Sequence, residues 1–262
     1  MPATAFQRIR ISCPSLPEAV AAYQHLLGFA PIWQGQVKSA DSSEFSSSAW
    51  FLVNNTILEL LPRDDQDAAV CGLVFRSDEV NATDDIVYRS DDGNEHVGTE
   101  QRVDKSSAMG LWLTLESEAN SMALLGDSSR SLDESAIQSV DHVVLYTNDA
   151  DGCVQTFGEQ GLGLRLALDK TVPEWGGRML FFRQGKLTLE IIQPNERFDG
   201  DDYFWGLAYQ VTNIDAVVAR LQNQGVTTSS VRDGRKPGTK VATVKSHHLN
   251  IPTLLVEPAI KR

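Results

Sequence analysis

The sequence is poor in basic residues, in cysteine and in long apolar runs. It has 23 Lys and Arg against 35 Asp and Glu, a formal net charge of -12. That balance opposes extended contact with phosphate backbones or anionic lipid. No stretch approaches the roughly 18 to 20 apolar residues that span a bilayer, and the start, MPATAFQRIRISC, lacks the apolar core of a signal peptide. We therefore expect a cytoplasmic protein that binds neither nucleic acid nor membrane.

The three cysteines, Cys13, Cys71 and Cys153, exclude two further classes. Their number is odd, they are far apart and they form no CxxC motif, so neither a disulfide framework nor a thiolate zinc site is indicated. We expect buried thiols. The sequence also has no glycine-rich motif that would cradle a phosphate group.

What the sequence does contain is an internal repeat. Residues 6–29 can be aligned with residues 140–164, and both read as a strand, a polar cap, a helix and a glycine. In the first copy, Ser15 and Glu18 have the spacing of a capping box and Gly28 marks the end of the helix. The pattern predicts a strand followed directly by a helix in each half of the chain.

The predicted helix ends of the later copies use similar signals. Asn148 or Asp149 can cap the second helix and Gly161 can end it. Asn213 caps a third copy, 205–226, which Gly225 ends.

Hairpins follow these helices. Residues 49–64 and 180–196 each read as two apolar strands around a polar or glycine-containing turn. A weaker copy runs from 70–80 to 110–117, with a short helix, and the polar stretch 91–110 inside it reads as a loop or a mobile edge. The repeating unit is therefore a strand, a helix and three strands (βαβββ), present four times.

Four such units predict an α+β protein with two curved sheets. One unit leaves an open sheet edge and half a core, so units should pair, with helices outside and a cavity inside. The polar stretch 126–139 separates the halves. We expect an N-terminal domain at 1–122 with a degenerate second unit, a linker at 123–138 and a C-terminal domain at 139–262 that carries the site.

Alternation along the predicted strands selects candidate site residues. Side chains two apart share a face, so His142 and Tyr146 lie together on the side opposite Val143 and Leu145. The same alternation is expected to place Glu190 and Glu257 on the face that the helices do not cover.

A fourfold βαβββ repeat with a His near the head of a first strand and a Glu near the end of a last strand resembles the vicinal oxygen chelate superfamily. That superfamily includes glyoxalase I, extradiol dioxygenases, methylmalonyl-CoA epimerase and bleomycin-resistance proteins. The resemblance covers essentially the whole chain and is clearest at 138–258. It implies glyoxalase-like domains and a divalent metal ion (Zn, Ni, Mn, Fe or Co) held by His142, Glu190 and Glu257, with Glu190 or Glu257 as a catalytic base.

Two positions depart from the family pattern. Gly206 falls where the second first-strand ligand would stand, and Gln210 lies four residues further on the same face. In the N-terminal half, Arg8 takes the position of His142, although Glu59 and Glu116 match the last-strand glutamates. A cation beside Arg8 would be repelled, so a metal site there is not favoured.

Further residues are candidates for ligand binding. The set consists of aromatic and polar side chains near strand ends: Tyr146, Trp175, Arg178, Trp205 and Gln210. Aromatic rings with one Arg can hold a planar or carboxylated small molecule. The same rings could instead plug the mouth of a barrel.

The resemblance implies a metal-dependent lyase, isomerase or epimerase acting on a small oxygenated substrate. The alternative is a metal-free protein that binds or sequesters a small molecule, as bleomycin-resistance proteins do. In that case His142 would only hydrogen-bond to Glu190 or Glu257. An extradiol dioxygenase is less favoured because a second histidine is missing. A homodimer is left open.

Overall fold

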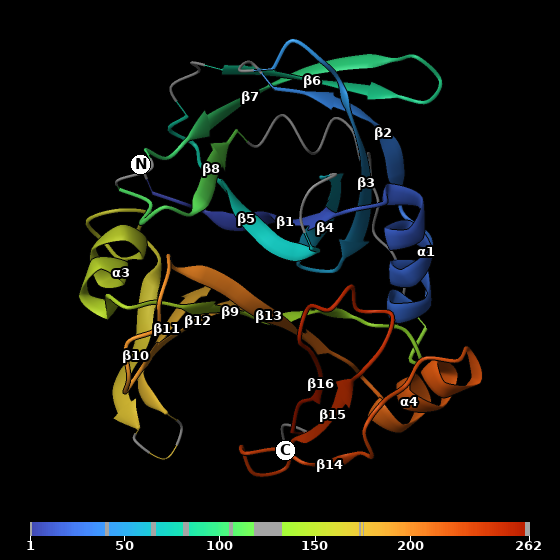
Figure 1. The fold of residues 1–262 in the computed structure, drawn as a ribbon, viewed down its shortest axis with the longest axis vertical. Helices are drawn as coiled ribbons and strands as arrows, with labels where there is room; N and C mark the ends of the chain where they lie inside the picture. Colours follow the sequence, from blue (N-terminus) through green and yellow to red (C-terminus); the bar gives the residue numbers. More distant parts are fainter. Residues whose placement is uncertain are drawn as a thin grey trace.

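The computed structural model describes residues 2–39, 42–63, 67–80, 84–104, 107–117, 133–172, 174 and 176–259. Figure 1 shows two curved sheets, one per half of the chain, with helices at their sides. The α+β class with two glyoxalase-like curved sheets is confirmed. Within the described ranges, the helices are too short or too polar to cross a membrane.

The first half forms a closed barrel, which we call the N-terminal barrel. Its strand order is β1-β4-β3-β2-β6-β7-β8-β5, and pairing of β2 with β6 closes it. Its strands are β1 (Ala5–Cys13), β2 (Trp33–Lys38), β3 (Ser46–Val53), β4 (Thr56–Pro62), β5 (Ala69–Arg76), β6 (Asp84–Ser90), β7 (Glu95–Arg102) and β8 (Trp112–Glu116).

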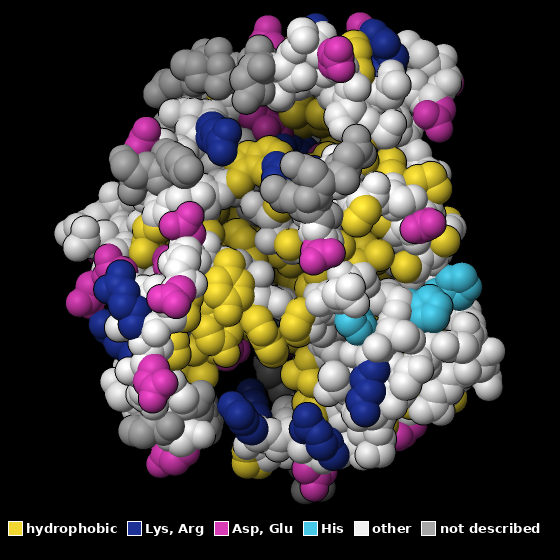
Figure 2. Space-filling view, viewed as in Figure 1, with side chains coloured by type: hydrophobic (Ala, Val, Ile, Leu, Met, Phe, Trp, Pro, Cys, Tyr) yellow, Lys and Arg dark blue, Asp and Glu magenta, His cyan; other side chains and the backbone are white. Residues whose placement is uncertain are grey.

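The second half forms an open sheet of 8 strands, the C-terminal sheet, in the order β10-β11-β12-β9-β13-β16-β15-β14. Its strands are β9 (Ser139–Tyr146), β10 (Arg165–Val172), β11 (Gly177–Gln184), β12 (Leu187–Pro194), β13 (Tyr203–Gln210), β14 (Arg232–Asp233), β15 (Lys240–Val244) and β16 (Thr253–Glu257). The edge strands β10 and β14 do not pair, so the sheet remains a cup. Figure 2 shows the hollow of this cup in the lower part of the molecule.

The sequence repeat and the strand order agree. In each half the first strands of two units lie side by side, β1 with β5 and β9 with β13, and each is flanked by its own unit's last strand. The predicted hairpins at 49–64 and 180–196 are β3–β4 and β11–β12. Consecutive units therefore pair within each half.

One predicted loop is wrong. The stretch 91–110 contains β7, which pairs with both β6 and β8. Its sequence, EHVGTEQR, is polar and has no strand signature. Pairing on both sides makes this segment a strand, because the barrel cannot close without it.

Three helices are described: α1 (Leu16–Leu27), α3 (Ala150–Phe157) and α4 (Ile214–Asn223). Asp149 and Asn213 cap α3 and α4 through backbone N–H groups, as predicted. The predicted capping box is wrong, since the Ser15 side chain makes no cap hydrogen bond, although Gly28 does end α1 in the left-handed region at φ 89°. Helix α3 ends at Phe157, before the predicted stop at Gly161.

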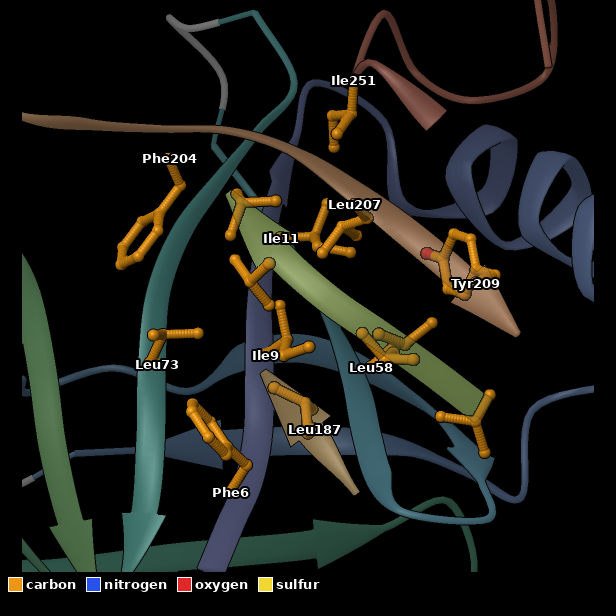
Figure 3. Packing of buried hydrophobic residues seen from close by; sticks show 14 of the residues in the cluster. Phe6, Ile9, Ile11, Leu58, Leu73, Leu187, Phe204, Leu207, Tyr209 and Ile251 are labelled. Carbon is orange, nitrogen blue, oxygen red and sulfur yellow. The ribbon is translucent and has the colours of Figure 1, made fainter. Parts of the chain in front are cut away.

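One apolar core joins the two halves. Alternation along β1 points Ile9 and Ile11 out of the N-terminal barrel, where they share a cluster with Leu187 and Leu207 of the C-terminal sheet (Figure 3). All four side chains are at most 2% exposed. The barrel and the helices therefore cover the convex face of the C-terminal sheet and leave its concave face open.

Candidate functional site on the concave face

A histidine and a glutamate meet on the concave face. His142 lies on β9 opposite Thr188 in the ladder with β12, two residues from Glu190. The Nε2 atom of His142 is 3.6 Å from Oε2 of Glu190, and its Nδ1 atom is 2.9 Å from Oδ2 of Asp141. These two contacts hold the imidazole of His142 between two carboxylates. Asp141 was not singled out from the sequence.

The environment of Glu190 favours its neutral form. Burial raises the pKa of this carboxyl above its ordinary value, and His142 and Arg235 offset part of that rise. A carboxyl with a raised pKa in a partly open cup is the kind of group that exchanges protons with a ligand. Arg235, in the turn before β15, was not singled out from the sequence.

The second first-strand position cannot carry a ligand to a metal. In the ladder, His142 pairs with Ala208 and Val144 pairs with Gly206, so Gly206 is the symmetric counterpart of His142. A Cβ atom at Gly206 would lie 2.5 Å from the carbonyl oxygen of Pro252. The backbone of Pro252 therefore requires glycine at this position and excludes any donor side chain.

The expected face of Glu257 is wrong. Its ladder partner Lys240 reaches Asp215 of α4 at 3.2 Å, and Leu255, two residues earlier on the same face, is buried. The Glu257 carboxylate accepts a 2.8 Å hydrogen bond from the backbone N–H of Ile214, the first residue of α4. It satisfies a helix N-terminus, and the structure does not bring it to His142 and Glu190.

These positions decide how a divalent ion would fit. Of the three ligands expected here, only His142 and Glu190 come together. Across the described residues, no group of three His, Cys, Asp or Glu side chains is arranged to hold a metal ion. The donor set does not fit a resident metal, which normally requires three or four protein ligands.

An aromatic wall stands beside the pair. The rings of Tyr146 and Tyr203 stack with centroids 5.6 Å apart, and Trp205 lies 6.0 Å from Tyr146. Phe198 contacts Tyr203 edge to face at 5.5 Å. Tyr203 and Trp205 are 44% and 45% exposed, an unusual degree for such large rings. The wall thus presents free aromatic surface.

The other three residues predicted to bind a ligand lie in different places. Arg178 lies on the opposite face, where its guanidinium binds Asp169 and Asp151 at 2.8 Å each, so the structure does not bring it to the His142–Glu190 pair. Gln210 shares the concave face, and its Oε1 accepts a 3.1 Å hydrogen bond from the Ser139 hydroxyl. Trp175 lies outside the described residues.

The corresponding place in the N-terminal barrel is filled. Arg8 is completely buried, with Nη1 2.9 Å from Glu116 and Nε 3.2 Å from Glu59, and it also pairs with Glu100. Arg10 adds contacts of 2.9 Å to Glu59 and 2.6 Å to Glu100. Burial lowers the pKa of Arg8 but the carboxylates raise it further, so it stays charged. This closed interior holds a guanidinium where the superfamily resemblance would place a metal.

Two curved sheets, each built from two paired units, with a His–Glu pair in the open one, have the layout expected from the resemblance to the vicinal oxygen chelate superfamily. Residues 141–243 match the family described as the Glyoxalase/Bleomycin resistance protein/Dioxygenase superfamily. The matched segment lies in the C-terminal half, so this half of the chain is similar to that superfamily. By sequence comparison, no curated protein matches the chain.

Solved structures with the same fold come from several branches. The Mn(II)-bound glyoxalase from Novosphingobium aromaticivorans is 15% identical, with 98% of this chain and 82% of that chain covered and a TM-score of 0.65. A mutant of 4-hydroxymandelate synthase from Streptomyces coelicolor is 14% identical over 100% and 95%, with a TM-score of 0.64. The 2,3-dioxygenase LapB from Pseudomonas sp. KL28 is 8% identical over 99% and 93%, with a TM-score of 0.61. At these identities the likeness shows the fold alone.

Proposed function

We propose that the concave face of the C-terminal sheet binds a small aromatic molecule without a resident metal. The observation that carries this proposal is the exposed aromatic wall of Tyr146, Tyr203 and Trp205 directly beside the His142–Glu190 pair. The rings supply stacking surface and the pair supplies a polar anchor. This is the metal-free alternative expected from the sequence, narrowed to an aromatic ligand.

A titration with 2-naphthol in EDTA tests this proposal. Binding is expected to weaken about three- to tenfold in Trp205→Ala and in Tyr146→Ala, because an aromatic pair contributes roughly 0.5–1.5 kcal/mol beyond area burial. Phe45→Ala is the matched control, since this half-buried ring lies against Lys38 and Arg89 of the N-terminal barrel. Equal weakening in all three variants would contradict the proposed site.

The competing account is a divalent ion held by His142 and Glu190, which would support a lyase or isomerase of the glyoxalase type. It draws on the Mn(II) bound by the similar glyoxalase structure. It predicts a near-stoichiometric ion after incubation with Mn, Fe, Ni or Zn, lost on His142→Ala. The proposal predicts no stoichiometric ion in either protein by mass spectrometry.

A second candidate is proton transfer on the bound molecule. It is favoured by one observation, the raised pKa of Glu190 next to a histidine held by Asp141. Glu190 would take a proton from the ligand and His142 would stabilise the charge that develops. Exchange of an acidic C–H of a bound aromatic ketone with deuterium, followed by NMR, tests it. Exchange that persists unchanged in Glu190→Gln would contradict it.

A further inference from the structure

The concave face has a charge opposite to that of the whole chain. The formal net charge is -12, yet the strands of this face carry several cations. One ladder row runs from Arg165 through Arg183 and Thr188 to His142. Paired residues of a sheet share a face, so both arginines point into the cup with the histidine.

The other side of the cup repeats this arrangement. Gln210 pairs with Val256, Val256 with Val241, and Val241 with Arg232, which places Arg232 on the concave face as well. Arg235, three residues further on in the following turn, lies close enough to Glu190 to lower its pKa. Lysine and arginine side chains accordingly rim the hollow in Figure 2.

Three of these cations, Arg165, Arg183 and Arg232, have no acidic partner among the described residues. The carboxylates described on the strands at this place are Glu190 and Asp141, and both lie against His142. Arg178 on the opposite face, in contrast, binds two carboxylates. Exposed arginines left unpaired around a cleft, in a chain with excess acid, form a site for an external anion.

We infer that the ligand of the cup is an aromatic anion, with its ring on the wall of Tyr146, Tyr203 and Trp205 and its carboxylate toward the arginines. This inference rests on the proposed function and adds the charge of the ligand to it. Arginine suits a carboxylate because its planar fork donates two parallel hydrogen bonds.

The test compares 2-naphthoate with the neutral isostere 2-naphthamide, both in EDTA at low ionic strength. Naphthoate is expected to bind about tenfold more tightly. Arg183→Gln and Arg232→Gln are each expected to weaken naphthoate several-fold and to leave naphthamide unchanged. Arg89→Gln removes the same charge from an exposed ion pair on the N-terminal barrel and serves as the control.

The outcomes separate the two proposals. Equal affinity for naphthoate and naphthamide, both reduced by Trp205→Ala, would overturn the anion inference and leave the aromatic site standing. If neither naphthoate nor naphthamide bound, both the anion inference and the proposed aromatic site would be overturned. Loss of naphthoate affinity in Arg89→Gln equal to that in Arg183→Gln would also overturn the inference, because general attraction to positive charge would then account for it.

Discussion

Replacement of Arg8 by methionine removes the centre of the charge network inside the N-terminal barrel. The guanidinium contacts Glu116 at 2.9 Å and Glu59 at 3.2 Å, and Arg8, Glu59 and Glu116 are at most 1% exposed. Methionine retains most of the aliphatic volume, so the cavity term is small. The substitution removes the positive charge that Glu59, Glu100 and Glu116 contact. Of the two arginines in the network, only Arg10 then remains.

Breaking a buried ion pair by removing one partner costs about 3–5 kcal/mol, because the other charge is left without compensation. That is a large part of the roughly 5–15 kcal/mol that stabilises a folded protein. At about 2–4 °C per kcal/mol for a chain of this size, Tm should fall by about 6–20 °C. Urea unfolding followed by far-ultraviolet circular dichroism measures the loss.

Two further variants test whether the loss of stability comes from the buried charge network. Arg8→Met combined with Glu116→Gln also removes the charge of a carboxylate that Arg8 contacts and should recover part of the stability. Arg89→Met removes the arginine of an exposed pair with Glu95, 39% and 48% exposed, and should cost no more than about 1 kcal/mol. If Arg8→Met cost no more than Arg89→Met, the network would contribute no stability to the barrel, contrary to this prediction.

The remaining predictions concern the C-terminal half and pH. The pKa of Glu190 is raised in the folded protein, so ionisation of this carboxyl destabilises the fold at pH values above the unfolded pKa of about 4.3. Glu190→Gln should therefore be more stable than wild type at pH 7, and this gain should vanish below about pH 4. A difference in unfolding free energy that does not change with pH would contradict this. The pKa of buried Glu59 is shifted the opposite way, because Arg8 and Arg10 lower it by more than burial raises it. The ionised Glu59 therefore stabilises the fold at pH values above its unfolded pKa, and this stabilisation is lost as the pH falls through its folded pKa. Gly206→Ala places a methyl group 2.5 Å from the Pro252 oxygen and should cost about 1–3 kcal/mol in thermal unfolding; a neutral effect would show that this backbone can move. Glu257→Ala removes the acceptor for the Ile214 N–H and should cost about 0.5–2 kcal/mol, with affinity for 2-naphthoate unchanged; a loss of affinity would return Glu257 to the site.

The repeat and the concave placement of His142 and Glu190 could be predicted from the sequence, because both follow from period-two alternation in apolar strands. Alternation did not succeed for Glu257. Its strand is short and has apolar residues on both faces, Leu255 on one and Leu254 and Val256 on the other, so the apolar pattern does not show which face the helix covers. The capping role of its carboxylate depends on where α4 begins in space.

The charge network was less accessible to sequence reasoning. Arg8, Glu59 and Glu116 could be matched by position, but Glu100 lies on β7, whose polar sequence reads as a loop. Only barrel closure brings that strand over Arg8. Similarly, Arg183 and Arg232 are distant in sequence, and their common face depends on strand register across the whole sheet.

The most direct test of the central claim, an aromatic site that works without a metal, is the affinity for 2-naphthoate before and after Mn(II) is added to EDTA-treated protein. The account predicts the same Kd in both states and a weaker Kd in Trp205→Ala. Binding that requires Mn(II), and that His142→Ala abolishes, would show that the pair holds an ion and would contradict the account.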